Sequence, residues 1–313
     1  MKKIKLLIFF LLISYVHGYA QNVGLKQGKT VTINGTELFI KVIGNGEPII
    51  IVHGGPVLDH SYLLPHLEQL SENYKLVFFD QRLSGRSSAE ADTADIKLST
   101  FIKDIQALQA YLSFEKIHIL GHSWGGLLAM KYAISHPSNI YSLILVSSMP
   151  PSSELWRKEE LILAETKTKE DSLARQKIMQ TEAFRKNSPK AIEKLLELSF
   201  RNQFYNRVNA ESLDLYVPDD YMTRSRLFGH LMGELSDYNL LKDLKKMTSP
   251  ALILYGSAEP ANKISGPILH KHIPNSEYII INKSGHFPFI EQTAKFTRYI
   301  QEFLEDIPQI NRE

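Results

Sequence analysis

The stretch Ile117-His118-Ile119-Leu120-Gly121-His122-Ser123-Trp124-Gly125-Gly126 decides the fold. Its first four residues have strand character, and a helical pattern starts at Gly126. A sharp turn must therefore join strand to helix, with Ser123 at its apex. Gly121 and Gly125 lack a Cβ, which allows the helix to pass close to the strand. The pattern predicts a strand–turn–helix unit that lifts the Ser123 hydroxyl out of a sheet.

Around this unit, short runs rich in β-branched and aromatic residues alternate with amphipathic stretches. We expect eight strands, at residues 30–33, 38–43, 48–52, 75–79, 116–120, 142–146, 251–255 and 278–281. Several of these runs, such as 49–52 and 279–281, are continuously apolar, which is typical of parallel strands covered on both faces. With helical patterns at 98–112, 126–135 and 293–304, the order predicts a doubly wound sheet flanked by helices.

The alternation stops between about residues 151 and 240. Charged helical stretches occupy this segment, for example 159–174 and 189–200. We interpret residues 151–240 as a helical cap inserted into a core made of residues 21–150 and 241–313. The alternative is that the segment extends the helical layer of the core.

The first twenty residues have the layout of a secretory signal peptide. Lys2, Lys3 and Lys5 precede an apolar run of 11 residues at 6–16, and Gly18 and Ala20 supply small residues for cleavage after Ala20. We therefore expect export to the periplasm or the exterior. The run is too short to span a bilayer. The alternatives are an uncleaved anchor and a buried strand.

Composition narrows the classes of function. The chain has 313 residues and no Cys, which excludes cysteine nucleophiles, disulfides and thiolate metal sites. Without the three lysines of the signal peptide, 33 basic residues face 34 acidic ones, a net charge of −1. Because the net charge is not positive, nucleic acid and anionic membranes are not expected as partners. The sequence does not fix the oligomeric state.

A serine nucleophile needs a base, and His286 is the best placed of the 11 histidines. It lies in Ser284-Gly285-His286-Phe287-Pro288, just beyond the last expected strand. His122 is adjacent to Ser123, but neighbouring positions on the turn point in different directions. Four other histidines fit structural positions: His118, His136, His270 and His272.

The third group must be a carboxylate that orients the imidazole. Glu259 is the first acid after the strand expected at 251–255, so it should lie at the same sheet edge. Glu154 and Asp237 are the alternatives. The resulting chain order of Ser123, Glu259 and His286 is that of the triad on this sheet architecture.

An acyl-transfer site also needs two donors for the oxyanion. The strand at 48–52 runs into His53-Gly54-Gly55-Pro56, whose glycines let a backbone amide approach a substrate carbonyl. We assign the amides of Gly55 and Trp124 to this oxyanion hole. The alternative is an ordinary Gly-Pro turn.

Three motifs together resemble the proline iminopeptidase branch of the α/β-hydrolase superfamily. They are the segment 53–56, Asp80-Gln81-Arg82 followed by Ser84-Gly85-Arg86-Ser87, and the segment 121–126. The resemblance implies an α/β-hydrolase fold with a mostly parallel eight-stranded sheet and a helical cap. It also implies removal of an N-terminal residue, often proline, from small peptides through an acyl-enzyme, with no metal and no cofactor. Asp80 and Arg82 we interpret as structural loop residues.

The chain departs from the pattern of these relatives at several positions. Val57 and Leu83 replace glycines, and the acid is Glu259 where the relatives have aspartate. Family members hold the substrate amine with glutamates, and Glu234 resembles the one in the cap. A second glutamate, which follows the triad acid in some relatives, is replaced by Pro260.

The motifs leave three functions open. The leading one is an exported serine hydrolase acting on small peptides, and its nearest rival is a carboxylesterase or amidase that acts on other small substrates. Dehalogenases and epoxide hydrolases of this architecture need an aspartate where Ser123 stands. The third possibility is a ligand-binding protein that keeps the fold without turnover.

Overall fold

The computed structural model describes residues 27–55 and 57–307. The signal peptide expected at residues 1–20 lies outside these residues, and so does Pro56. None of the helices in the described part of the chain combines the length and the hydropathy of a bilayer span.

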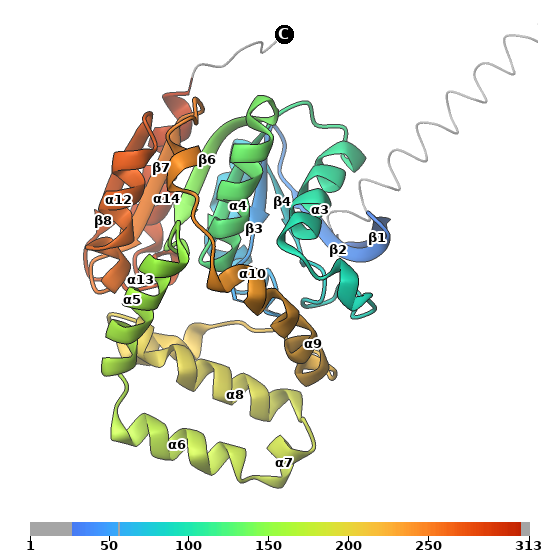
Figure 1. Cartoon of the computed structure of the whole chain (residues 1–313), viewed down its shortest axis with the longest axis vertical. Helices are drawn as coiled ribbons and strands as arrows, with labels where there is room; N and C mark the ends of the chain where they lie inside the picture. The colour runs from blue at the N-terminus through green and yellow to red at the C-terminus, as the bar shows by residue number, and fades with distance from the viewer. Residues whose placement is uncertain (1–26, 56, 308–313) are drawn as a thin grey trace, which may run out of the picture.

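All eight predicted strands are present and form one sheet (Figure 1). Their bounds are β1 Lys29–Ile33, β2 Thr36–Ile43, β3 Glu47–Val52, β4 Tyr74–Phe79, β5 Ile117–His122, β6 Ile140–Val146, β7 Ala251–Gly256 and β8 Ser276–Ile281. The spatial order is β1-β2-β4-β3-β5-β6-β7-β8. The contacts of β2 with β1 and β4 are antiparallel, and all neighbours from β4 to β8 are parallel. The prediction of a mostly parallel sheet is confirmed.

Apolar cores lie on both faces of the sheet, and β3 shows how the sequence feeds them. Ile50 and Val52 belong to one core, whereas Ile49 and Ile51 belong to the other. This alternation with period two explains why the run is continuously apolar. The helices over the first core are α3 Leu98–Tyr111, α4 Trp124–Ser135, α11 Leu241–Leu244 and α12 Ser265–His272. Those over the second are α2 Leu64–Leu67, α13 Pro288–Glu291 and α14 Thr293–Glu305.

The segment between β6 and β7 is helical. It contains α5 Ser153–Glu165, α6 Lys169–Met179, α7 Glu182–Arg185, α8 Pro189–Phe200, α9 Tyr221–Phe228 and α10 Met232–Ser236. Figure 1 shows α6, α7 and α8 together beyond one end of the sheet. The chain enters and leaves this segment at one place, where Ser152 and Asn239 form an isolated antiparallel bridge. We call residues 151–240 the cap.

One helical expectation in the cap is wrong. The stretch 159–174 is not one helix, because α5 ends at Glu165 and α6 begins at Lys169. The break is stabilised by a capping box, in which the Thr168 hydroxyl accepts from the amide of Asp171 and the Asp171 carboxylate accepts from the amide of Thr168. Since the local Thr–Asp pair satisfies these amides, a new helix begins there.

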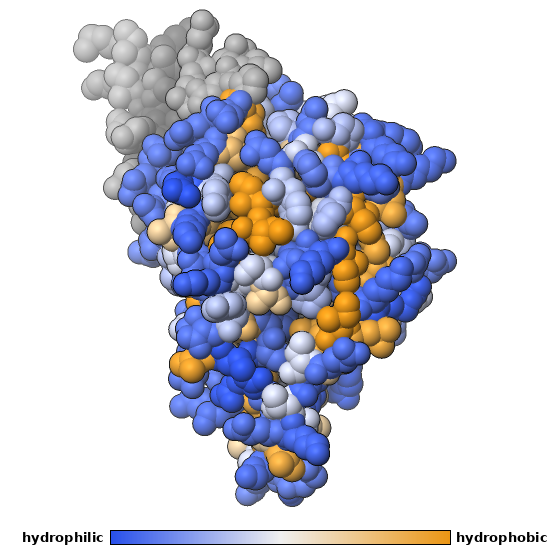
Figure 2. Space-filling view, turned by 90° about the vertical axis from the view of Figure 1, so that its left-hand side faces the viewer, coloured by the Kyte–Doolittle hydropathy of each residue, from blue (hydrophilic) through white to orange (hydrophobic). Residues whose placement is uncertain are grey.

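The exposure of large apolar side chains differs between the sheet and the cap. Figure 2 shows a face that is mainly hydrophilic, with hydrophobic side chains in separate patches. Most large apolar side chains with high exposure belong to the cap, such as Leu161 at 69% and Val208 at 67%. On the sheet, Ile280 of the edge strand β8 is 43% exposed. The core helices therefore cover the sheet well, while apolar groups of the cap remain accessible.

A buried ion pair connects the loop after β4 to α3. The guanidinium of Arg82 donates to both carboxylate oxygens of Asp104, at 2.6 and 2.7 Å, and Asn34 donates to Asp104 as well. The side chains of Arg82 and Asp104 are only 5% and 2% exposed. Arg82 thus has the structural role expected for it.

Replacing Arg82 with Met should destabilise the protein by about 3–5 kcal/mol, because Asp104 is left buried without its counter-charge. Urea unfolding would measure the loss. The control is Arg298→Met, since Arg298 pairs with Glu302 on the surface and both side chains are more than half exposed. We expect the control to change stability by less than about 0.5 kcal/mol. Equal losses in both variants would contradict the role of the buried pair.

Candidate active site

Ser123 occupies the turn between β5 and α4 and has a strained backbone. Its φ of 54° and ψ of −120° are rare for a residue with a side chain. The surrounding backbone holds it in place, since the amide of Ser123 donates to Val146 and its carbonyl accepts from Met149. As the sequence predicts, the turn exposes Ser123 at the end of the sheet.

The glycines beside Ser123 are required by close backbone contacts. A Cβ on Gly121 would lie 2.3 Å from the carbonyl oxygen of Gly125, and one on Gly125 would lie 2.0 Å from that of Val52. Any side chain at either position would force strand and helix apart. The spacing of Gly121 and Gly125 around Ser123 therefore reflects sterics that the sequence pattern identifies correctly.

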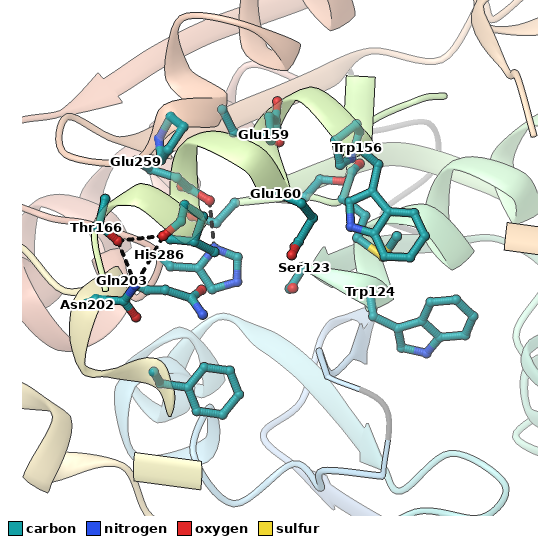
Figure 3. Close-up of a pocket in the computed structure, with 18 of the residues that line it drawn as sticks. Ser123, Trp124, Trp156, Glu159, Glu160, Thr166, Asn202, Gln203, Glu259 and His286 are labelled. Atoms are coloured by element: carbon teal, nitrogen blue, oxygen red, sulfur yellow. Dashed lines mark hydrogen bonds and ion pairs between the residues drawn. The ribbon is translucent and has the colours of Figure 1, made fainter. Parts of the chain in front are cut away.

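His286 and Glu259 meet at the carboxyl ends of β8 and β7. Nδ1 of His286 lies 2.6 Å from Oε1 of Glu259, and the two side chains are 16% and 9% exposed. Because an ionised carboxylate only accepts, Nδ1 carries the proton and Nε2 is left to accept one. Figure 3 shows the ring of His286 between Glu259 and Ser123.

The other two acids considered from the sequence lie elsewhere. Glu154 is exposed and pairs with Lys158 one turn along α5. Asp237 is exposed at the end of α10. Among the described residues, Glu259 is the carboxylate that His286 contacts.

Ser123 and His286 line the same pocket, but no hydrogen bond joins them within the described structure. Such bonds are often long in unliganded enzymes and shorten when substrate binds. The loop that carries His286 is fixed from the cap, because the amide of His286 donates to the carbonyl of Gln203 at 2.8 Å. The position of the cap thus influences the position of the imidazole.

Gly55 and Trp124 both border this pocket. Gly55 has a φ of +59°, and Trp124 is the first residue of α4, where an amide has no partner within its own helix. The peptide that links Gly54 to Gly55 is oriented by His53, whose Nδ1 lies 2.9 Å from the carbonyl oxygen of Gly54. This arrangement suits two amides directed at a developing oxyanion.

The pocket has a volume of about 270 Å³ and lies between core and cap. Its apolar wall includes Trp124, Met149, Trp156 and Phe200. Its polar wall contains three glutamates: Glu159, Glu160 and Glu259. A small apolar group with a positive charge nearby would match this lining.

Glu159 was not identified by the sequence analysis. It lies on α5, and its carboxylate accepts hydrogen bonds from the amide of Ser265, at 3.2 Å, and from the hydroxyl of Ser265. Burial, together with the nearby charge of Glu259, raises the pKa of Glu159 to about 7. In the sequence it is one of several charges on a cap helix, and no local signal distinguishes it from its neighbours.

Glu234 does not reach the pocket, which corrects the expectation that it holds the substrate. It is exposed on α10, and its Oε1 accepts from the amide of Leu98, the first residue of α3, at 3.4 Å. The carboxylate therefore caps a helix N-terminus, where negative charge is favourable. Its resemblance to a substrate-binding glutamate came from sequence context alone.

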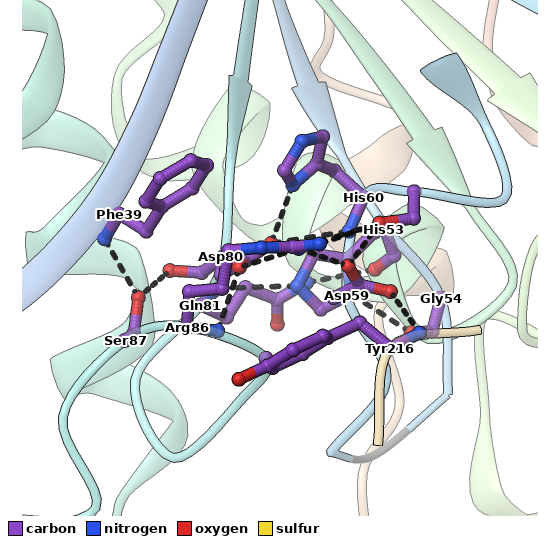
Figure 4. A network of polar contacts seen from close by, with 12 residues as sticks. Phe39, His53, Gly54, Asp59, His60, Asp80, Gln81, Arg86, Ser87 and Tyr216 are labelled. Carbon is purple, nitrogen blue, oxygen red and sulfur yellow. Dashed lines mark hydrogen bonds and ion pairs between the residues drawn. The ribbon is translucent and has the colours of Figure 1, made fainter. Parts of the chain in front are cut away.

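A buried polar cluster supports the loop before α2 and the loop after β4 (Figure 4). Asp80 accepts from Nδ1 of His60 at 2.6 Å and from the amide of Arg86 at 2.8 Å. The guanidinium of Arg86 lies 2.6 Å from Asp59 and 4.1 Å from the ring centroid of Tyr216 in the cap. Asp80 thus has a structural role, as expected.

Ligand atoms of Asp59, His60 and Asp80 lie within 4.8 Å of one another, a spacing that a metal ion could bridge. However, the guanidinium of Arg86 already lies 2.6 Å from Asp59 and 3.7 Å from Asp80. We therefore assign these acids to ion pairing.

Comparison with known proteins supports the fold and the resemblance. Residues 47–293 match the family model described as alpha/beta hydrolase fold. The proline iminopeptidase of Lactobacillus crispatus (strain ST1) is 28% identical over 87% of this chain and 95% of its own length. That of Heyndrickxia coagulans is 27% identical over 84% of this chain and 92% of its own length. The resemblance found in the motifs is confirmed.

Solved structures agree on the architecture. The crystal structure of the Mycobacterium smegmatis proline iminopeptidase superposes with a TM-score of 0.68 at 24% identity, and covers 89% of this chain and 97% of its own. VinJ gives a TM-score of 0.70 at 19% identity, over 90% of this chain and 99% of its own. At these identities the matches bear on the fold alone.

The raised pKa of Glu159 predicts a pH-dependent stability. In the unfolded chain the group returns to its ordinary pKa of 4.5, so between that pH and about pH 7 the folded state binds more protons. Stability contributed by Glu159 is therefore lost as pH rises through this window. Relative to Glu159→Gln, the wild type should lose about 1–3 kcal/mol between about pH 5 and about pH 8.

Urea unfolding at the two pH values measures this difference. Glu154→Gln on the same helix is the control, because Lys158 lowers the pKa of Glu154 and this group stays ionised across the window. A constant difference between wild type and Glu159→Gln would contradict the assignment.

Proposed function

The chain belongs to the alpha/beta hydrolase fold family, and we propose that it is an exported serine hydrolase that removes an N-terminal residue, proline foremost, from small peptides through an acyl-enzyme. One observation carries the proposal. Ser123 on a strained turn shares a pocket with His286, and Nδ1 of this histidine is bound to Glu259 at 2.6 Å. A protein that only bound its ligand would have no need for this combination.

In the proposed first step, Ser123 attacks the carbonyl carbon of the scissile bond. Nε2 of His286 takes the hydroxyl proton, and Glu259 stabilises the imidazolium that forms. The proton then passes to the leaving amine, which departs as the C–N bond breaks and leaves an ester on Ser123. Water attacks this ester with His286 as base, and the free acid is released.

The amides of Gly55 and Trp124 are proposed to bind the oxyanion in both tetrahedral intermediates. Both residues border the pocket next to Ser123. The hydrogen bond from His53 to the carbonyl of Gly54 supports the orientation of the Gly55 amide. Loss of one such donor typically costs about 10²- to 10³-fold in rate.

Glu160 is the residue we propose for recognition of the substrate amine. It projects from α5 into the pocket close to Trp156 and Ser123 (Figure 3). Glu159 and Glu259 already accept hydrogen bonds from Ser265 and His286. Glu160 is exposed, and among the described residues it makes no hydrogen bond or ion pair, so its carboxylate is available to an ammonium group.

A carboxylesterase is the second candidate. The apolar wall of the pocket would accept the acyl group of an ester, and Pro260 stands where some relatives have an amine-binding glutamate. In this case the carboxylates would contribute little to binding. Export is proposed on the N-terminal sequence pattern alone.

Three substrates separate the candidates. A proline aminopeptidase should cleave Pro-p-nitroanilide and lose at least about 10²-fold in kcat/KM when the amine is acetylated, because the blocked substrate has no ammonium group to pair with the glutamate of the pocket. An esterase should instead prefer p-nitrophenyl acetate and be indifferent to the blocked amine. A fluorophosphonate probe should label the wild type and not Ser123→Ala. Absence of label on folded wild-type protein would overturn the proposed chemistry.

Replacing Glu160 with Gln should raise KM for Pro-p-nitroanilide roughly 10-fold, because one charge-assisted hydrogen bond becomes neutral. Hydrolysis of p-nitrophenyl acetate should stay within about twofold of the wild type. Glu234→Gln is the matched control, since Glu234 lies outside the pocket, and it should change neither reaction. If Glu234→Gln alone raised KM for the free-amine substrate, the assignment to Glu160 would be wrong.

A further inference from the structure

A chain of hydrogen bonds runs behind the candidate active site and links three of its loops. The amide of Gly54 donates to the hydroxyl of Tyr62 at 2.6 Å, and this hydroxyl lies 2.8 Å from Nδ1 of His122. Nε2 of His122 lies 3.0 Å from the backbone oxygen of His286. Tyr62 and His122 are 1% and 2% exposed, so water does not compete for these bonds.

The acceptor at one end of this series of hydrogen bonds determines which atoms carry the hydrogens. The backbone oxygen of His286 can only accept, so Nε2 of His122 carries a hydrogen. If His122 is neutral, its Nδ1 has no hydrogen and accepts from the hydroxyl of Tyr62. The same hydroxyl accepts from Gly54, and every group in the chain is then satisfied. If His122 were charged, Nδ1 would donate to Tyr62 and leave the tyrosine hydrogen without this partner.

The surroundings of His122 favour the neutral form. Burial, followed by the nearby His286, lowers the pKa of His122 well below its ordinary value. The rings of Phe287 and Phe289 pack against it, with centroids at 5.6 and 5.0 Å. The titratable groups that face it are Tyr62, His53 and His286, and burial keeps Tyr62 protonated by raising its pKa.

The geometry leaves little room for another arrangement. A Cβ on Gly54 would lie 2.8 Å from Nδ1 of His122 and 2.9 Å from the hydroxyl of Tyr62. These hydrogen bonds therefore require a glycine at position 54, directly before Gly55, the proposed oxyanion donor. The hydrogen bonds thus connect three loops, which carry Gly55, Ser123 and His286.

We propose that Tyr62 and His122 are positioning residues. They hold the loop that carries Gly55 and the loop that carries His286 in place relative to Ser123, and they keep a neutral ring beside His286. This rests on the proposed function. The rings of His122 and His286 are 4.9 Å apart between centroids, so a charge on His122 would oppose the imidazolium that forms on His286 during catalysis. With Nδ1 committed to Tyr62, His122 remains uncharged while His286 takes up its proton.

The first test uses the wild-type protein and needs no activity. Long-range ¹H–¹⁵N NMR of the imidazoles reports tautomer and charge, with the His122 signals assigned by their loss in His122→Gln. We expect a neutral ring protonated at Nε2, unchanged from about pH 5 to about pH 9. A ring that titrates near its ordinary pKa, or one protonated at Nδ1 alone, would overturn the proposal.

The second test measures the effect on the nucleophile. Tyr62→Phe removes one hydroxyl and leaves the amide of Gly54 and Nδ1 of His122 without their partner. The rate of fluorophosphonate labelling and kcat for Pro-p-nitroanilide should both fall roughly 10- to 100-fold, because displaced loops misalign the reacting groups. KM should change by less than about threefold, since the pocket wall is intact.

Tyr132→Phe is the matched control, because Tyr132 is another fully buried tyrosine, which donates to Gln109 in the packing of α4 against α3. It should label at the wild-type rate. Equal labelling of Tyr62→Phe and wild type, or equal losses in both tyrosine variants, would overturn the positioning role. Failure of the wild type to label would instead overturn the proposed function. Should Tyr62→Phe not fold, the NMR measurement on the wild type still determines which ring nitrogen of His122 carries the hydrogen.

Discussion

The close approach of β5, α4 and β3 is the constraint on which the site depends. Backbone atoms of these three elements meet at Gly121 and Gly125, where a single additional carbon would come within 2.3 Å of a carbonyl oxygen. This contact compresses the connection between strand and helix and leaves Ser123 with positive φ. The strain is tolerated because the surrounding sheet is buried on both faces and the backbone bonds of Ser123 to Val146 and Met149 hold the turn.

Parallel strands bring the remaining groups to the same edge. Their carboxyl ends lie side by side, so the loops after β3, β5, β7 and β8 converge although they are distant in sequence. Gly55, Ser123, Glu259 and His286 come from these four loops. The cap then closes the site and also contacts it directly, through the bond between Gln203 and the His286 amide. Core and cap therefore determine the position of the His286 imidazole together.

Much of this could be predicted from the sequence, because the relevant signals are local. The apolar runs identify all eight strands, and the order of loops at the carboxyl edge suffices to choose Glu259 over Glu154 and Asp237. The cap residues that line the pocket are harder to predict, because the cap helices carry many exposed charges and their orientation depends on tertiary packing. The sequence therefore points to Glu234, whereas the structure has Glu159 and Glu160 at the pocket. Tyr62 carries no motif that reveals its contact with His122.

The charges of the pocket explain why the identity of these cap residues matters. Three glutamates and one imidazole line the same small, partly apolar cavity, where interactions between charges are stronger than in water. Burial, and after it the charge of Glu259, raises the pKa of Glu159, so a further negative charge in this pocket is unfavourable. A ligand that brings a cation would offset this unfavourable charge, whereas a neutral ligand would not. Glu159 and Glu160 both project from α5, so under the proposed function a preference for a cation would come from the cap, while the bond-breaking groups would come from the core.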